Sequence, residues 1–327
     1  MPLKYSPKTL SDIMLSATLV KQEAQALGFS AAGLAPAEAV EPWRQAQWQA
    51  WLGDRRQGEM DYLERNLEKR LNPTLLVDGA KTIVSVALGY FPAVSLSPEG
   101  YTMARYAYGQ DYHDVVRHRL EKLMQRLGLE PHKDGRAFCD TAPIDERYWA
   151  WRCGLGWMGR HTQLIIPPQH GRKECGGGTY FFLGELVLKH RADHYDQPID
   201  SHCGTCQRCL EACPTDALSD RGLDARKCLS YLTIEHRGPL DESLATHVTP
   251  CIYGCDRCAE ACPWNKFAKP TTVTEFSPSK ALMAMTKADW HSLSVEQYQH
   301  LFKGSAVKRA KFEGLKRNIE AAKKHSS

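Results

Sequence analysis

Cys203-Gly-Thr-Cys206-Gln-Arg-Cys209-Leu-Glu-Ala-Cys213-Pro214 is the first of two cysteine clusters that decide the fold, and the second is Cys251-Ile-Tyr-Gly-Cys255-Asp-Arg-Cys258-Ala-Glu-Ala-Cys262-Pro263. Eight of the twelve cysteines lie in these two stretches. Three thiolates spaced three residues apart on one loop can bind three irons of a cubane, and the Cys-x3-Cys-Pro that follows sends a fourth thiolate to the other cubane. The pattern is typical of a two-cluster ferredoxin and predicts a protein that transfers single electrons.

Zinc and disulfides are the competing explanations for these cysteines. Structural zinc favours two Cys-x2-Cys pairs separated by a longer gap, whereas the first cluster has three evenly spaced cysteines followed by Cys-Pro. Disulfides require an oxidising compartment. The N-terminal sequence Met-Pro-Leu-Lys-Tyr-Ser-Pro-Lys has neither the apolar segment of a secretory signal nor a twin arginine, so we expect a cytoplasmic protein.

The crossed ligand pattern of two-cluster ferredoxins assigns seven thiolates. The first [4Fe-4S] cluster is expected to be bound by Cys203, Cys206, Cys209 and Cys262. The second is expected to be bound by Cys255, Cys258 and Cys213, and it then lacks one ligand. Cys251 and Cys228 are the two candidates for that place, and the spacing alone leaves both open. Cys139, Cys153 and Cys175 are interpreted as small buried apolar residues.

Composition and charge give the outer limits. A chain of 327 residues with 43% hydrophobic and 24% charged residues has the balance of a soluble globular protein of two or three domains. No apolar run approaches the roughly 20 residues that cross a bilayer. The net charge of +4 is unevenly distributed, because residues 301–327 hold eight Lys or Arg against two Glu. This basic C-terminal segment is a candidate polyanion contact, with a solvated helix face as the alternative.

Periodicity and turn residues predict an α+β protein with a mixed α/β domain over residues 1–190, an iron-sulfur module over 191–270 and a helical segment over 271–327. Helices are expected over 8–27, 43–52 and 113–129, from Pro143 to Gly154, and from residue 215. Strands are expected over 82–88, 136–140, 163–166 and 179–188. In the last segment the expected apolar contacts are Trp290, Leu293, Tyr298 and Leu301. No long heptad or apolar stripe is evident, so we expect a monomer.

The larger domain should hold the substrate and a second redox centre. Gly154-Leu-Gly156-Trp-Met-Gly159 has the letters of a dinucleotide fingerprint, but it follows a predicted helix and precedes a predicted strand, which is the reverse of the required order. We interpret it as a loop whose backbone lies close to a flat ligand or to another element, with a turn needed only for packing as the alternative.

Five separated motifs resemble the epoxyqueuosine reductase family. They are Arg105-Tyr-Ala-Tyr-Gly-Gln-Asp-Tyr-His113, Asp140-Thr-Ala-Pro143, Arg152-Cys-Gly-Leu-Gly-Trp-Met-Gly-Arg-His-Thr162, Cys228-Leu-Ser-Tyr-Leu-Thr-Ile-Glu235 and Cys262-Pro-Trp-Asn265. The resemblance implies two [4Fe-4S] clusters, a cobalamin, and a reductive-dehalogenase-like cobalamin-binding domain beside a ferredoxin-like one. The resemblance also implies that Cys228 is the fourth ligand of the second cluster. The implied reaction reduces epoxyqueuosine to queuosine at the wobble position of tRNA with GUN anticodons, with electrons from an unidentified donor.

The implied cobalamin is bound without a histidine ligand to cobalt. Asp111-Tyr-His113-Asp-Val-Val116 is the nearest match to the Asp-x-His-x-x-Gly signature of histidine ligation, and its last position is Val. The positions carried over from the family as cofactor contacts are Tyr62, Arg105, Tyr106, Asp140, Trp157, Gly159, His161 and Thr162. Each aromatic residue among them has plain core packing as its alternative.

Removal of the epoxide oxygen takes two electrons and two protons, and an acid must protonate the leaving oxygen. Asp140 matches the family's proposed proton donor, and N-capping of the following helix is its alternative role. For tRNA the candidate contacts are Arg237, Lys308 and Arg309, because phosphates are bound by Lys and Arg. Two other functions remain open from the sequence: a reductase of a small organohalide-type substrate, and an electron carrier without a substrate.

Overall fold

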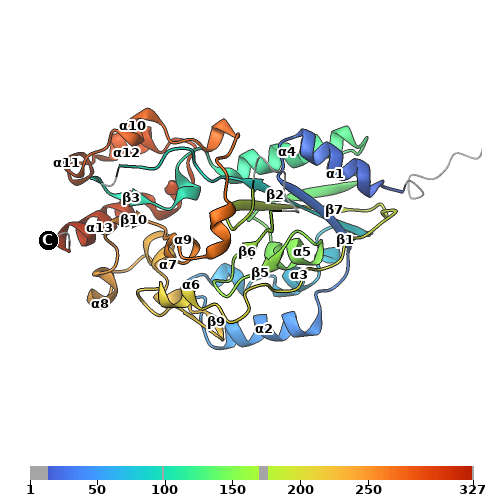
Figure 1. Cartoon of the computed structure of the whole chain (residues 1–327), viewed down its shortest axis with the longest axis horizontal. Coiled ribbons are helices and arrows are strands. Elements are labelled where there is room, and N and C mark those ends of the chain that lie inside the picture. The colour runs from blue at the N-terminus through green and yellow to red at the C-terminus, as the bar shows by residue number, and fades with distance from the viewer. Residues whose placement is uncertain (1–13, 98, 169–175, 326–327) are drawn as a thin grey trace, which may run out of the picture.

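The computed structural model describes residues 14–97, 99–168 and 176–325 (Figure 1). Its larger half is built on an antiparallel four-stranded sheet with the order β1-β2-β7-β4. The strands are β1 (Ala31–Pro36), β2 (Thr82–Gly89), β7 (Phe181–Leu188) and β4 (Gly135–Phe138). The central strands β2 and β7 pair along their full length, and nearly all of their residues are buried. This explains why both appear in the sequence as continuous apolar runs.

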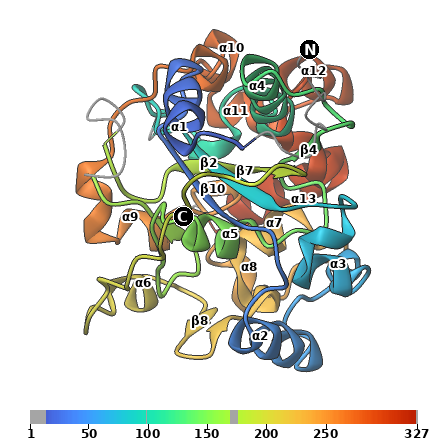
Figure 2. The same cartoon turned by 90° about the vertical axis from the view of Figure 1, so that its right-hand side faces the viewer.

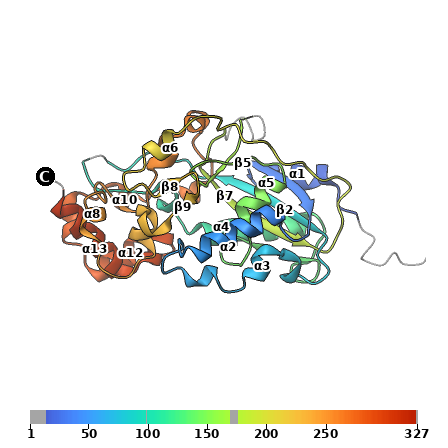
Figure 3. The same ribbon diagram turned by 90° about the horizontal axis from the view of Figure 1, so that it is seen from below.

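Helices cover both faces of this sheet (Figure 2). α1 (Ala17–Ala26) and α4 (Tyr112–Arg126) lie on one face, and α3 (Leu67–Leu71) and α5 (Glu146–Arg152) on the other. Val84, Val86 and Leu88 of β2 join the core on the first face, whereas Ile83 and Ala87 join the core on the second. This alternation follows from the two-residue repeat of a strand. α2 (Pro42–Gly53) lies farther out, beyond α5 (Figure 3).

The cysteine-rich part contains only short elements. They are α6 (Arg208–Glu211), β8 (Leu218–Ser219), β9 (Gly222–Leu223), η5 (Ala225–Lys227), α7 (Leu229–Ile234), α8 (Glu242–Ala245), β10 (Cys251–Tyr253), α9 (Arg257–Glu260) and η6 (Pro263–Phe267). Each cysteine cluster runs through one short helix, and these two helices, α6 and α9, lie next to each other. The module is tied to the sheet domain by Asn265, whose Oδ1 accepts a hydrogen bond of 2.7 Å from the Thr179 backbone N–H.

The C-terminal segment forms a third core together with residues from earlier in the chain. Its elements are η7 (Thr274–Phe276), α10 (Lys280–Met283), α11 (Lys287–His291), α12 (Val295–Leu301), η8 (Ala306–Ala310) and α13 (Lys311–Lys324). Trp290, Leu293 and Tyr298 are buried as predicted, and Leu301 packs against them. This core also contains Tyr101 and its neighbours, because β3 (Thr102–Met103) pairs in parallel with β10. The three-segment division stays a prediction, since packing crosses both boundaries.

The remaining elements are η2 (Asp61–Leu63), η3 (Pro73–Leu75), η4 (Arg105–Ala107), β5 (Trp157–Met158) and β6 (Leu164–Ile165). Two predicted helix starts are wrong, those at Pro143 and at residue 215. Of the helix expected over 8–27, the structure describes α1, which begins at Ala17 after the capping residue Ser16. Residues 8–13 of that expectation lie outside the described residues, as does Cys175. α5 begins at Glu146, because residues 140–144 form a loop. No helix begins at residue 215, where the chain leads into the β8-β9 hairpin. Within the described ranges, no helix has the length and apolarity to cross a membrane.

Candidate active site

Asp140 stands at the end of β4, where the chain leaves the sheet. Its φ of +51° lies in the left-handed region, which Asp tolerates better than most residues. Its side chain is 57% exposed, so the carboxyl group is accessible to a ligand. The N-cap of α5 is Asp145 rather than Asp140. The capping interpretation of Asp140 is therefore wrong.

Two adjacent residues of α4 converge on one oxygen of Asp140. The Tyr112 hydroxyl donates a hydrogen bond to Asp140 Oδ2, and His113 Nε2 lies 3.6 Å from the same atom. The Tyr112 ring stacks on the Phe182 ring and on the His113 ring, with centroid distances of 4.3 Å and 4.0 Å. This stacking restrains the rings of Tyr112 and His113. Among the contacts of the described residues, Asp140 Oδ1 receives no hydrogen bond, so this oxygen is available to a substrate.

The carboxyl group of Glu146 lies beside Asp140 and has the opposite protonation preference. The surrounding protein atoms favour a raised Asp140 pKa, but the interactions with His113 and Tyr112 and the nearby Arg147 charge outweigh this effect, so the pKa is lowered. Burial and the charge of Asp140 raise the pKa of Glu146 to about 8. Glu146 Oε1 accepts a hydrogen bond from the Asp140 backbone N–H. At neutral pH Asp140 is ionised and Glu146 carries a proton.

His113 is a cation at neutral pH. Burial favours a lower pKa, but the contact with Asp111, the nearby Asp140 and the charges of these two carboxylates raise the His113 pKa to about 9. The imidazolium and the ionised Asp140 stabilise each other, which is the reason that the two pKa values move apart.

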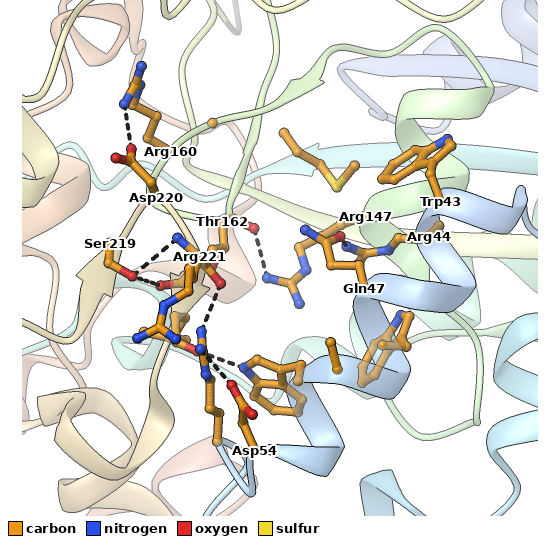
Figure 4. A pocket seen from close by; sticks show the side chains of 18 residues that line it. Trp43, Arg44, Gln47, Asp54, Arg147, Arg160, Thr162, Ser219, Asp220 and Arg221 are labelled. Atoms are coloured by element: carbon orange, nitrogen blue, oxygen red, sulfur yellow. Dashed lines mark hydrogen bonds and ion pairs between the residues drawn. The ribbon is translucent and has the colours of Figure 1, made fainter.

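A cavity of about 640 Å³ opens between α2 and the β8-β9 hairpin, and Arg147 of α5 is among its lining residues (Figure 4). Tryptophans from α2 give it an apolar wall, and the chain from Met158 to Thr162 forms another wall. Five guanidinium groups line it, from Arg44, Arg56, Arg147, Arg160 and Arg221. An apolar wall with several cations suits a large flat ligand that carries a negative group.

The wall between Trp157 and Thr162 contains buried donors without a protein partner. His161 Nδ1 accepts a hydrogen bond of 3.2 Å from the Gln163 backbone N–H, so the ring proton is placed on Nε2. Burial lowers the His161 pKa to about 4, which keeps the ring neutral. Within the described part of the chain, His161 Nε2 and Trp157 Nε1 are buried and have no hydrogen-bond partner. A bound acceptor group would satisfy such donors.

Gly159 is required where it stands, because a Cβ there would come within 2.6 Å of the His161 ring. Gly159 and Thr162 line the cavity, whereas Trp157 packs behind it against Trp264, with ring centroids 4.8 Å apart. The structure thus brings these four residues together. The backbone at Gly156 lies close to that of Ile165, so the loop approaches another segment of the chain, and its contact with a ligand stays a prediction.

Arg147 links this cavity to Asp140. Its Nη1 donates a hydrogen bond of 2.7 Å to the Thr162 carbonyl oxygen (Figure 4), and its charge lowers the pKa of Asp140. The cavity and the exposed carboxyl group are therefore adjacent parts of one site.

The other predicted contacts lie elsewhere around this site. Tyr106 packs against Tyr112 at 6.0 Å, close to Asp140. The Arg309 guanidinium lies over the Tyr62 ring, 5.3 Å from the ring centroid. Burial raises the Tyr62 pKa, and the charges of Glu235 and Asp140 act in the same direction. Arg105 is at the module interface, where it binds Asp256 at 3.2 Å and Glu260 at 2.6 Å. Its guanidinium is thus used to join the two halves.

The predicted cluster ligands fall into two sets of neighbouring thiols. Burial and the nearby charge of Cys262 raise the Cys209 pKa, and Cys203 and Cys206 act in the same direction on both residues. Cys203 and Cys262 also pack against Trp157 in one small core. The first set therefore contains Cys203, Cys206, Cys209 and Cys262.

The second set lies near the chain segment that follows the cavity wall. Burial raises the Cys258 pKa most, and the nearby thiols of Cys255, Cys228 and Cys213 raise it further. Burial and Cys228 also raise the Cys255 pKa to about 11. The Gln163 side-chain amide lies 4.0 Å from Cys258 Sγ, and Gln163 directly follows the cavity residue Thr162.

Cys251, the competing candidate, is bound differently. Its thiol lies 3.4 Å from the carbonyl oxygens of Tyr253 and Gly254, and burial raises its pKa to about 12. Among the described residues, Cys255 is the thiol that raises the Cys251 pKa, whereas Cys228 acts on both Cys255 and Cys258. The described residues contain no group of three or more His, Cys, Asp or Glu that could hold a single metal ion.

The three predicted tRNA contacts differ in availability. Arg237 donates its guanidinium hydrogen bonds to the carbonyl oxygens of Ile234, Arg309 and Ala310, so it stabilises the junction with η8. Arg309 forms a two-pronged ion pair with Glu235, with both distances 2.8 Å. Lys308 is exposed.

Sequence reasoning missed the residues that surround Asp140 and those that line the cavity. Tyr112, Glu146 and Arg147 lie within or beside the quoted motifs, so their closeness to Asp140 in the chain was an available signal. Trp43, Trp48 and Trp51 form one wall of the cavity together with the β8-β9 hairpin. No local pattern indicates that these distant segments meet.

Comparison with known proteins shows to which family the chain belongs. The model of the 4Fe-4S double cluster binding domain family matches residues 202–265, and that of epoxyqueuosine reductase QueG, DUF1730, matches residues 70–141. An epoxyqueuosine reductase of Leadbetterella byssophila is 41% identical over 305 residues, which cover 93% of this chain and 97% of that protein. The chain belongs to the epoxyqueuosine reductase family. It is therefore a member of an oxidoreductase family with a double [4Fe-4S] domain.

Solved epoxyqueuosine reductases share this fold. One, bound to a stem loop of tyrosine tRNA that carries epoxyqueuosine, is 26% identical with a TM-score of 0.80 and covers 94% of this chain and 80% of its own. Another, from Bacillus subtilis, has a catalytic loop with an aspartate swung out of the active site, and it is 27% identical with a TM-score of 0.80 over the same shares of the two chains.

Proposed function

We propose that this protein reduces epoxyqueuosine to queuosine at the wobble position of tRNA, using cobalamin supplied with electrons by two [4Fe-4S] clusters. The observation that carries the proposal is the exposed Asp140 carboxyl group beside a large cavity, which in turn lies beside the second set of thiols. Family membership gives the reaction class, and the tRNA-bound relative supports the substrate.

The two sets of thiols suit two cubanes. Cys203, Cys206, Cys209 and Cys262 would bind one cluster, and Cys213, Cys228, Cys255 and Cys258 the other. The second cluster would be connected to the cavity wall through Gln163, which contacts Cys258 and is adjacent in the chain to Thr162. Electrons from the donor would then enter at the first cluster and leave from the second.

The cavity residues suit cobalamin. The His161 and Trp157 donors have no partner among the described residues, Gly159 permits close approach, and the arginine-lined side offers charge for a phosphate group. When bound, reduced cobalamin supplies the two electrons that the deoxygenation consumes. The neutral His161 would serve as a hydrogen-bond donor through Nε2, without acting as a ligand to the metal.

Asp140 is proposed as the catalytic acid that protonates the epoxide oxygen. Its Oδ2 is occupied by Tyr112 and faces His113, so Oδ1 is the atom placed for the substrate. The catalytic loop of the Bacillus subtilis relative carries an aspartate, which supports a loop aspartate in this role. Because Asp140 is ionised in the free protein, it has to take up a proton before it can act as the acid.

Asp140→Asn tests the proposal. The holoenzyme should be assayed on tRNA that carries epoxyqueuosine, with a strong chemical reductant that bypasses the natural donor. We expect retained clusters and bound corrinoid but a loss of at least about 10²-fold in turnover, as is typical of a missing acid-base group. Asn is close in size to Asp, so the fold should persist. Turnover near that of the unchanged protein would reject Asp140 as the acid.

A further inference from the structure

A second cavity, of about 330 Å³, lies between the turn that follows α7 and the start of α13. Residues 236–239 line one side of it, and the residues that line the other side are Ala310, Lys311, Glu313, Gly314 and Arg317. Three of the described lining residues, Arg237, Lys311 and Arg317, are cations, whereas Glu313 is the one carboxylate. The lining therefore has a net charge of +2 without His236.

Arg317 forms a fixed cationic wall of this cavity. Its Nη1 donates hydrogen bonds of 2.8 Å and 2.7 Å to the carbonyl oxygens of His236 and Gly238, and its Nη2 donates one of 2.7 Å to that of Leu232. Among the described residues no carboxylate forms an ion pair with Arg317. Burial and the neighbouring Arg237 charge lower the Arg317 pKa, so two guanidinium groups lie close together and repel each other.

Arg237 and Lys311 keep donors for a ligand. Arg237 uses Nη1 and Nη2 for carbonyl oxygens, but in the described ranges its Nε has no acceptor. Lys311 is exposed, and its ammonium group has neither a hydrogen-bond acceptor nor an ion pair in that part of the chain. α13 begins here with Ala310 as its N-cap, which offers no side-chain acceptor to the first N–H groups of the helix. An anion with several oxygens would satisfy these donors and reduce the repulsion between the two guanidinium groups.

We propose that this cavity binds a backbone phosphate of the tRNA anticodon stem loop. Arg237 and Lys311 contact the phosphate oxygens, and Arg317 contributes its charge from the wall. The inference rests on the proposed function, which makes tRNA the substrate. The binding site is thus assembled from the turn after α7 and the start of α13, and Arg237 is one member of it rather than an isolated contact.

The position of the cavity relative to Asp140 favours the anticodon stem loop. Arg237 Nη2 donates a hydrogen bond of 2.9 Å to the Arg309 carbonyl oxygen, and the Arg309 guanidinium lies over the Tyr62 ring. The charge of Asp140 acts on the Tyr62 pKa, so these two side chains are near each other. Successive neighbours therefore lead from the cavity to the proposed acid. Contacts to the RNA backbone fix the register of the strand, so a phosphate held here would help to place the wobble base at Asp140.

The experiment measures binding rather than turnover. The anaerobic holoenzyme is titrated against a labelled synthetic anticodon stem loop of tyrosine tRNA, and fluorescence anisotropy is followed at several salt concentrations. Lys311→Gln removes one exposed charge and keeps the length of the side chain. With about 0.8 counterions released per phosphate contact and equal affinities at about 1 M salt, the variant should bind about 10-fold more weakly at about 50 mM salt and about 4-fold more weakly at about 200 mM.

Glu313→Gln gives the opposite sign. This substitution removes the carboxylate from the lining, so the variant should bind the stem loop more tightly, with a steeper salt dependence. Lys323→Gln is the matched control, because it removes an exposed charge from the same helix twelve residues away, about 18 Å along the axis. Its binding should equal that of the unchanged protein. Effects of equal size in Lys311→Gln and Lys323→Gln would show a general field of the basic segment and overturn the cavity as a site.

Neutral linkages in the stem loop identify the phosphate. Stem loops with a single methylphosphonate in place of one phosphate should include one that binds the unchanged protein more weakly but loses no further affinity to Lys311→Gln. Absence of any such coupled position would overturn the proposal. Inorganic phosphate at constant ionic strength is the second probe. If it raises the melting temperature in a Lys311-dependent way while no linkage is coupled, the cavity binds a free anion and the assignment to RNA is wrong.

These measurements separate the cavity from the proposed reaction. A coupled linkage in a protein that leaves epoxyqueuosine unreduced would support the phosphate site and reject the proposed function. Reduction of epoxyqueuosine by a protein whose stem-loop binding is insensitive to Lys311→Gln and to Glu313→Gln would reject the phosphate site alone.

Discussion

The ion pair between Arg44 and Asp145 joins α2 to the start of α5, and its disruption should strongly destabilise the larger domain. Asp145 Oδ2 lies 2.6 Å from Arg44 Nε, and Oδ1 lies 3.0 Å from Nη2. Trp48 Nε1 donates a further hydrogen bond of 2.6 Å to Oδ2. Both charged side chains are almost completely buried. Asp145→Asn would leave the Arg44 guanidinium buried without a counter-charge.

The size of the effect follows from this burial. Removal of one partner of a buried ion pair costs about 3–5 kcal/mol. One kcal/mol lowers the melting temperature of a domain of 150–250 residues by about 2–4 °C, so the expected loss is roughly 6–20 °C. Despite burial, the charge and hydrogen bonds of Arg44 hold the Asp145 pKa below the usual 3.8. The pair therefore stabilises the fold above pH 4 and is lost only as the pH falls through that lowered pKa.

Thermal unfolding of the holoenzyme, followed by circular dichroism, measures the loss. The difference between Asp145→Asn and the unchanged protein should be the same at pH 6 and pH 8. The double variant Arg44→Met with Asp145→Leu is the matched control, because it removes both charges, and it should recover most of the loss except for the unpaired Trp48 N–H, worth about 1–3 kcal/mol. A decrease below about 2 °C, or a double variant no better than the single one, would refute a stabilising buried pair.

The remaining predictions concern the clusters and the tRNA contact. Cys228→Ser should lower the iron content from about eight per chain and abolish activity, whereas Cys251→Ser should leave both nearly intact; the opposite result would assign the fourth ligand to Cys251. Replacement of Lys308, Arg309 and Lys311 by Ala should weaken tRNA binding and flatten its salt dependence, because each lost phosphate contact removes close to one released counterion. Binding with an unchanged salt slope would indicate a solvated helix face.

The central strands of the sheet could be predicted from the sequence because they are buried on both faces. The run Thr82-Ile-Val-Ser-Val-Ala-Leu88 coincides with β2 apart from its last residue, Gly89, and the apolar stretch from Thr179 contains all of β7. Cysteine spacing also predicted the double cluster domain, because cubane geometry restricts which thiols can bind the same cluster. Both signals are local in sequence.

The start of α5 was predicted wrongly for a physical reason. Pro143 is a favoured first residue of a helix, yet Asp140 adopts a left-handed conformation and Asp145 is held by Arg44 from α2. A contact 101 residues away in the chain thus decides where the helix begins. The same limit applies to the cavity, which is assembled from α2, the loop before β6 and the β8-β9 hairpin.

The position of Asp140 at the end of β4 explains how protons and electrons could reach one substrate from different directions. α4 and α5 cover opposite faces of the sheet, and both send side chains to Asp140, His113 from the first and Glu146 from the second. The thiols approach from the other module, through Gln163 and the cavity wall. Because Arg147 contacts this wall and also acts electrostatically on Asp140, a change of charge on the cavity side would alter the ease with which Asp140 is protonated. Negative charge that accumulates in the cavity would partly offset the Arg147 cation and raise the Asp140 pKa, so the acid would gain its proton when electrons arrive.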